Sequence, residues 1–164
     1  MASILKVNTI QDATNSNTAM TIDSSGRVLT PLRPMFYATM SAITAANNVV
    51  KFDTIQVNVG NCYDASTGRF TSSITGHYWF AFNVLSDNDG TDAYGEVRVR
   101  KNGTTYSNST FRTELDNDFN GLATGVVNLP SGEYIDCYST LKAYGNSGDE
   151  HLDKLTHASV FLIG

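Results

Sequence analysis

The chain has 164 residues, a formal net charge of −5 at pH 7 and only 16% charged residues, and Ser, Thr and Asn are abundant. This length suits one domain with a short extension. Thr fits a pleated strand and Asn fits tight turns, so the composition favours strands over helices. The acidic balance excludes the basic face that nucleic-acid binding requires. No apolar run is long enough to span a membrane, so we expect no membrane insertion.

Residues 1–33 contain two short apolar stretches separated by polar residues. The turn-forming residues from Asp23 to Gly26 separate two strand-like pieces and predict a hairpin. Strands this short do not stabilise themselves in water. They therefore need a partner surface, supplied by other chains of an oligomer or by a larger particle. Pro34 marks a stiff junction to the rest of the chain.

This segment resembles the N-terminal and shaft repeats of bacteriophage tail-fibre and related virion proteins. The shared pattern is Leu-x-Val-x-x-Ile, then Thr-Ile-Asp, then Gly-x-Val, and it occurs here in one copy. The resemblance implies that residues 1–33 attach the protein to other virion proteins. The alternative is that they form an ordered edge of the following domain. The residues expected to make the attachment are Ile4, Leu5, Val7, Ile10, Ile22 and Val28.

A strict alternation of aromatic residues follows Gly76, where Tyr78, Phe80 and Phe82 lie two residues apart. Side chains in a strand switch faces at every residue, so these three aromatics share one face. Three buried aromatics remove a large apolar area from water, which predicts a strand through the middle of the core. The residues expected to define the fold are Phe52, Asn58, Tyr63, Phe70, Gly76, Tyr78, Phe80 and Phe82.

His77 and Trp79 occupy the opposite face of the same predicted strand. A Trp that faces only solvent would be unusual, so a neighbouring subunit is one candidate to cover it. Packing against a second sheet and an exposed ligand platform are the two alternatives.

The spacing from Phe52 to Phe82 resembles the signature of the complement C1q-type, tumour-necrosis-factor-like globular head. The resemblance implies an all-β, ten-stranded jelly-roll sandwich over residues 34–164 that assembles as a homotrimer and binds through exposed loops or its apex. Glu133 departs from the usual Asp, and the chain carries no collagen-like stalk. Further matching segments are the first strand at 34–38, the hairpin at 97–103, the strand pair at 127–135 and the closing strand at 158–164.

Three predicted loops, at 87–92, 116–120 and 144–149, concentrate acidic and hydrogen-bonding residues. Carboxylates crowded in a loop suit calcium, and Asp87, Asp89 and Asp92 are the candidate ligands. The spacing does not match an EF-hand, and a solvated acidic loop is the alternative. No other cofactor is expected. The candidate ligand-binding residues are Asp87, Asp89, Asp92, Asp116, Asp118, Tyr144 and Asn146.

No catalytic signature occurs in the sequence, which lacks a Gly-x-Ser-x-Gly elbow, a P-loop and a His-Glu-x-x-His motif. We therefore expect no enzymatic activity and assign no catalytic residue. The first residues lack the apolar run of a signal peptide. We accordingly expect Cys62 and Cys137 to be reduced, partly buried thiols.

These observations predict a homotrimeric bacteriophage virion protein that is made in the host cytoplasm. Its expected role is that of a tail-fibre or tail-tip adhesin whose head binds a host surface glycan or protein. One alternative is a capsid decoration protein with a mechanical or weakly adhesive role, which the short attachment segment favours. A secreted complement-like lectin is the third hypothesis, and the missing export signal argues against it.

Overall fold

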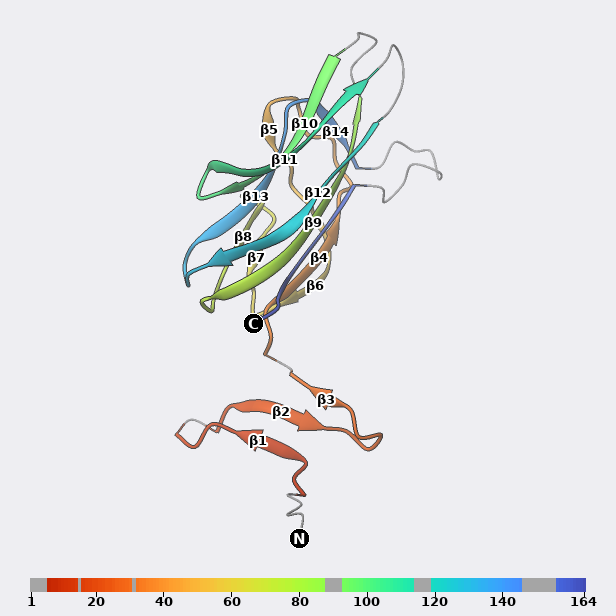
Figure 1. Cartoon of the computed structure of the whole chain (residues 1–164). Helices are drawn as coiled ribbons and strands as arrows, with labels where there is room; N and C mark the ends of the chain where they lie inside the picture. Colours follow the sequence, from red (N-terminus) through yellow and green to blue (C-terminus); the bar gives the residue numbers. More distant parts are fainter. Residues whose placement is uncertain (1–5, 15, 31, 88–92, 114–118, 146–155) are drawn as a thin grey trace. The chain divides into compact units, whose positions relative to one another are not determined.

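The computed structural model describes residues 6–14, 16–30, 32–87, 93–113, 119–145 and 156–164. The chain divides into two compact units, Met1–Arg33 and Pro34–Gly164. Every regular element among the described residues is a β-strand, so the all-β prediction is confirmed (Figure 1). Within the same residues, no helix is long and apolar enough to cross a membrane.

The N-terminal unit is an antiparallel sheet of three strands, with β2 in the middle. A turn joins β2 to β3, and Gly26 adopts a φ of +79° there. The Asp23 N–H donates to the Arg27 carbonyl at 3.0 Å, and the Asp23 carboxylate accepts the Arg27 N–H at 3.0 Å. The predicted turn is therefore confirmed. The strands are β1 (Thr9–Gln11), β2 (Thr18–Ile22) and β3 (Val28–Leu29).

The second unit, the head, consists of two antiparallel sheets. The β9 sheet has the order β12-β9-β15-β4-β6, with the short β14 also paired to β9. The β10 sheet has the order β11-β10-β13-β8-β7, with the short β5 paired to β13. The strands are β4 (Met35–Thr39), β5 (Asn48–Val49), β6 (Thr54–Val59), β7 (Tyr63–Asp64), β8 (Arg69–Thr71), β9 (Gly76–Asp87), β10 (Ala93–Lys101), β11 (Thr104–Thr113), β12 (Phe119–Leu129), β13 (Tyr134–Ser139), β14 (Lys142–Tyr144) and β15 (His157–Leu162).

The two five-strand paths supply the ten strands expected of the head, and β5 and β14 add two short ones within the described residues. Strand β9 lies between β12 and β15, so it is an interior strand of its sheet. Its alternating residues Tyr78, Phe80 and Phe82 are at most 2% exposed and face the β10 sheet across the core. The ring of Phe70, on β8, meets that of Tyr78 edge to face at a centroid distance of 5.5 Å.

A two-residue turn closes the hairpin between β10 and β11. Asn102 and Gly103 have φ values of +51° and +82°. Two consecutive residues with positive φ make a type I′ turn, whose twist matches that of the strands and which Asn-Gly adopts readily. The Asn102 side-chain oxygen also accepts the N–H of Tyr134 at 3.1 Å, which fastens the turn to β13.

Both cysteines are free and buried. Cys137 is 0% exposed and Cys62 is 4% exposed, so both thiols are more deeply buried than we expected from the sequence. Burial in an apolar interior disfavours the thiolate and raises the pKa of the Cys137 thiol. Burial likewise raises the pKa of the Tyr63 phenol, whose oxygen accepts the Phe52 N–H at 2.8 Å.

Candidate functional site

Strand β9 presents His77, Trp79, Ala81 and Asn83 on the face that points away from the core, since alternate residues of a strand point to opposite sides. The neighbouring strands extend this outer face in register. One row joins Trp79 to Val126 of β12 and to Phe161 of β15. The rings of Trp79 and Phe161 pack at a centroid distance of 5.0 Å.

The row through Trp79 runs from β12 to β6 across the β9 sheet and is apolar at every position. Val126 is 47% exposed, Phe161 42% and Met35 36%. Monomeric proteins rarely expose a contiguous row of large apolar side chains, and such patches mark interaction sites. The row consists of Val126, Trp79, Phe161, Met35 and Val59.

Two further rows lie beside the apolar row and contain no Asp, Glu, Lys or Arg. The rows become more polar toward the end of the head at which β9 terminates. We call the three rows together the β9-sheet face. The second row is Thr124, Ala81, Ser159, Tyr37 and Val57, and the third is Leu122, Asn83, His157 and Thr39.

The outer face of the β10 sheet has the opposite character. The Arg100 guanidinium makes two hydrogen bonds, of 2.7 and 2.9 Å, to the carboxylate of Asp136, and these bonds raise the pKa of Arg100. Arg98 pairs with Glu96, and Arg69 stacks on the Tyr134 ring at 4.2 Å. Charged groups that satisfy one another keep this face compatible with water, whereas the β9-sheet face exposes uncharged and apolar side chains.

The three alternatives for Trp79 can now be compared. The second sheet packs on the opposite side of β9, so it does not cover Trp79. The indole is half-buried by Phe161 of its own sheet. A neighbouring subunit and an exposed ligand platform therefore remain as the two candidates for its outer side.

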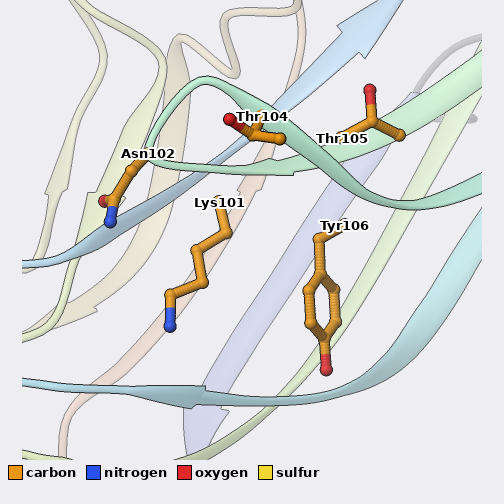
Figure 2. Close-up of a pocket in the computed structure, with 5 residues that line it drawn as sticks. All are labelled: Lys101, Asn102, Thr104, Thr105 and Tyr106. Carbon is orange, nitrogen blue, oxygen red and sulfur yellow. The ribbon is translucent and has the colours of Figure 1, made fainter.

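An open hollow of about 350 Å³ lies beside the β10–β11 hairpin (Figure 2). Its most polar group, the Lys101 amine, is already engaged with the Asn128 carbonyl at 2.9 Å and the Glu133 carboxylate at 2.7 Å. The Tyr106 hydroxyl donates to the Val126 carbonyl at 2.9 Å. These contacts attach the hairpin to β12 and assemble no nucleophile with a base. The lining residues are Lys101, Asn102, Thr104, Thr105 and Tyr106.

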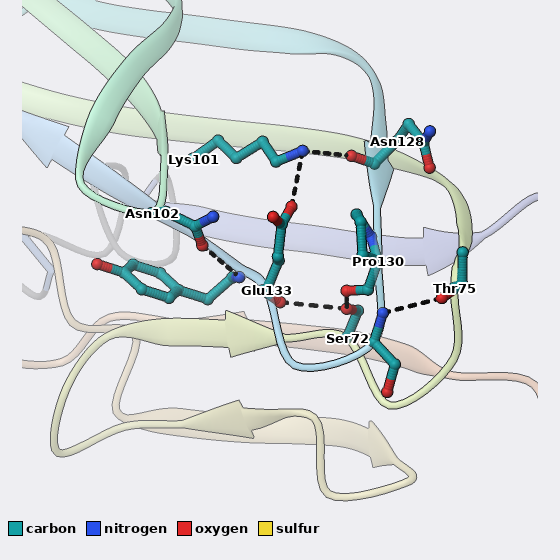
Figure 3. A network of polar contacts seen from close by, with 9 residues as sticks. Ser72, Thr75, Lys101, Asn102, Asn128, Pro130 and Glu133 are labelled. Atoms are coloured by element: carbon teal, nitrogen blue, oxygen red, sulfur yellow. Dashed lines mark hydrogen bonds and ion pairs between the residues drawn. The ribbon is translucent and has the colours of Figure 1, made fainter.

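A network of hydrogen bonds fastens one end of the head (Figure 3). Ser72 bonds through its N–H to the Glu133 carbonyl at 2.9 Å and through its hydroxyl to the Pro130 carbonyl. The Ser131 N–H donates to the Thr75 hydroxyl at 3.0 Å. These bonds tie the turn between β12 and β13 to the segment between β8 and β9. This end of the head is therefore held rigidly.

The chain enters the head at this fastened end. The Pro34 carbonyl accepts the Leu162 N–H at 3.0 Å, and the first residue of β9, Gly76, pairs with the last residue of β12, Leu129. The opposite ends of the same strands lie at the far end of the head. There Ser86 pairs with both β12 and β14, close to where β9 terminates. The chain thus enters the head, at Pro34, at the end opposite to these strand termini.

The strand residues next to the three acidic segments that the sequence singled out all lie at the far end of the head. Asp87 is the last residue of β9 and pairs with Lys142, and Tyr144 is the last residue of β14. Asp87 and Tyr144, which we expected in loops, are therefore strand residues, because strand pairing continues through both. Phe119 and Asn120, which we expected in the loop at 116–120, belong to β12.

Of the predicted ligand-binding residues, Asp87 and Tyr144 lie within the described ranges. Within the described part of the chain, no group of three or more His, Cys, Asp or Glu side chains is gathered as a metal site. Tyr144 is half-buried, and the Lys142 amine lies 4.9 Å from the centre of its ring. The residues that lie outside the described ranges are Asp89, Asp92, Asp116, Asp118 and Asn146.

The predicted attachment residues divide between two places in the N-terminal unit. Ile10, Ile22 and Val28 are 42%, 37% and 60% exposed and lie on its three strands. Val7 is half-buried and precedes β1. Ile4 and Leu5 lie outside the described residues.

Sequence reasoning identified Trp79 but missed its partners Phe161, Met35 and Val126. The signal was present, because β15 and β12 carry large apolar residues on both faces of the strand. Such a strand is buried on both sides or is covered by a partner. Which residues share a row depends on register, however, and the sequence did not reveal it.

Comparisons with known proteins agree with this geometry. Residues 35–151 match the family model of the C1q domain. Complement C1q tumor necrosis factor-related protein 3 of Mus musculus is 32% identical over 90 residues, which cover 54% of this chain and 35% of that protein. The phage-like element PBSX protein XkdV of Bacillus subtilis is 30% identical over 115 residues, which cover 65% of this chain and 16% of that protein. The chain thus spans about a third or less of these curated relatives.

The fold agrees as well. The globular domain of zebrafish complement 1qA superposes with a TM-score of 0.59 at 15% identity, covering 80% of this chain and 98% of that one. The predicted jelly-roll sandwich and the resemblance to the C1q head are confirmed. The chain belongs to the C1q domain family.

Proposed function

We propose that this protein is a homotrimeric bacteriophage virion protein, a tail-fibre or tail-tip adhesin. Its head binds a glycan or protein on the host surface, and residues 1–33 attach it to other virion proteins. Similarity to a protein of a phage-like element supports the virion assignment. Domains of the C1q type are binding and structural modules, and the described residues assemble no catalytic group.

The observation that carries this proposal is that the chain enters the head at one end and the strands next to the acidic segments terminate at the other. The chain enters beside Pro34, at the end fastened by the hydrogen-bond network. The strands next to the three acidic segments terminate at the opposite end. A head attached at one end leaves the other free to meet a host surface, and the acidic segments are our candidates for that contact.

The β9-sheet face supports the homotrimer. The face is uncharged, contains the apolar row and is exposed on a single chain. Domains of the C1q type usually assemble as trimers, and covering this face with two neighbouring copies would remove the row from water. Three copies of each acidic segment then convert weak individual contacts into useful avidity.

Light scattering on the purified chain tests the trimer. We expect a mass of three times the 17.8 kDa of one chain. Phe161→Asp adds a charge to the apolar row without touching the core and should lower the mass at micromolar concentration. Thr71→Asp, on the exposed face of the β10 sheet, is the matched control and should leave the mass unchanged. A monomeric wild-type chain would contradict the proposal.

Cryo-electron microscopy of virions labelled with an antibody to the head tests the assignment to the tail. Label at the distal end of a tail fibre or tail tip supports the adhesin. Label across the capsid lattice would replace it with the decoration protein.

Competition tests the adhesion itself. Purified trimer should reduce adsorption of the phage to its host, and a trimeric Asp116→Asn/Asp118→Asn variant should compete less well.

If Asp87, Asp89 and Asp92 bind calcium, chelation should lower the melting temperature of the head, and added calcium should restore it. An unchanged melting temperature would rule out a structural calcium ion.

A further inference from the structure

The three-stranded sheet of the N-terminal unit has one apolar face. Ile10 pairs with Met20, and Ile22 pairs with Val28. Met20 and Ile22 lie two residues apart on β2, so all four side chains point to the same side of the sheet. We call this side the stalk face. The opposite side carries Thr9, Thr21 and Leu29, which pair in one row across the sheet.

Among the described residues of the N-terminal unit, none forms a layer over the stalk face. Val28 is 60% exposed, Ile10 is 42% exposed, and the described residues of the unit form a single layer of strands. A sheet with one apolar side is stable only when a second layer buries that side. Three short strands without such a layer are marginal in water. The stalk face therefore requires a partner.

We infer that the partners are the stalk faces of two further copies of this chain, which together form a three-sided β-prism with Ile10, Met20, Ile22 and Val28 inside. This inference rests on the proposed homotrimer. The stalk face has no charged side chain, so three identical faces can meet without like-charge repulsion.

The covalent connection favours copies of the same chain over a foreign partner. The residues between β3 and Pro34 number four and span at most about 14 Å when extended. Three heads that associate therefore hold three N-terminal units close together. The effective concentration for such tethered partners is in the millimolar range. A foreign protein would have to compete with two neighbours that are already present.

This arrangement assigns separate roles to the attachment residues. Ile10, Ile22 and Val28 hold the three chains together, and Val7 and the residues before it remain available for the virion. The stalk face thus holds the three chains together and is not the surface that binds the virion.

Hydrogen exchange on the purified full-length chain, with no virion protein present, tests the inference. We expect the amides of Thr18–Ile22 to be protected in the wild-type trimer. Ile22→Asp should accelerate their exchange roughly tenfold or more, because it opens the sheet locally. Thr21→Asp is the matched control on the opposite face of the same strand, and it should leave the exchange unchanged.

Light scattering on the same samples distinguishes a failure of the prism from a failure of the homotrimer. A wild-type trimer whose Thr18–Ile22 amides exchange as fast as an unfolded chain would overturn the prism and leave the homotrimer standing. Equal protection in Ile22→Asp and Thr21→Asp would also overturn the prism. A monomeric wild-type chain would overturn the homotrimer and, with it, the prism.

Discussion

The head and the N-terminal unit have the same kinds of strand and turn but differ in what covers their strands. Both are antiparallel sheets with a glycine of positive φ in a hairpin turn, Gly103 in the head and Gly26 in the N-terminal unit. In the head, two sheets bury each other, and Phe80 is 0% exposed. In the N-terminal unit a single sheet leaves Val28 60% exposed. A second layer, and not strand propensity, therefore decides which part of the chain is stable by itself.

The head should lose the most stability when a core aromatic is removed. Phe80→Ala leaves a cavity between the sheets and should lower the free energy of unfolding by about 3–5 kcal/mol. Trp79 is the only Trp of the chain and lies on β9, so its fluorescence reports the head in a denaturant titration. Ile22→Ala, in the N-terminal unit, is the control and should leave that transition unchanged. An unchanged transition for Phe80→Ala would show that the core has been misplaced.

Removing an ion pair should also destabilise the head when the pair lies in the head and not when it lies in the N-terminal unit, but the loss of stability should be smaller than for a core aromatic. Asp136 is 1% exposed and holds Arg100 through two hydrogen bonds. Asp136→Asn leaves the guanidinium without its carboxylate and should cost the head about 2 kcal/mol. Asp23→Asn removes the exposed pair with Arg27 and should not change the Trp79 transition at fixed chain concentration. Equal effects of the two substitutions would contradict the comparison.

The two turn glycines make a closer comparison. A Cβ on Gly103 would meet only the Tyr134 hydroxyl at 3.5 Å, and a Cβ on Gly26 would meet nothing within 4 Å. Either substitution by Ala costs about 1 kcal/mol of backbone strain, because φ is positive at both positions. Thermal unfolding of the head, followed at Trp79, should report the loss for Gly103→Ala alone. A shift of similar size for Gly26→Ala would mean that the two units unfold together.

Alkaline pH should weaken the head gradually. Burial raises the pKa of the Cys137 thiol and of the Tyr63 phenol above their ordinary values of 9.0 and 10.0. The folded chain keeps both protons while the unfolded chain releases them, so stability is complete below about pH 8 and declines as the pH rises further. Denaturant midpoints measured across this range should fall, and the fall should be shallower in Cys137→Ala. Midpoints that stay constant or rise would contradict the buried positions of both groups.

Much of the head was predictable because its signals are local. The alternation of Tyr78, Phe80 and Phe82 predicted a core strand, because the side chains of a strand switch faces at every residue. The hairpin at 97–103 was instead predicted from the resemblance to the C1q-type head. Strand ends were less accurate. Pairing with β14 extends β9 to Asp87, where the sequence alone suggested a loop.

By itself, the sequence determined the fold class, the side of β9 that enters the core, the two turns and the apolar residues of the N-terminal unit. Only the tertiary structure decided that Trp79 lies in one row with Val126, Phe161 and Met35, which are far apart along the chain. It also decided that Pro34, where the chain enters the head, and the strand ends next to the acidic segments lie at opposite ends of the head. The reason is that side-chain alternation is a property of a single strand, whereas register is set by pairing between distant strands.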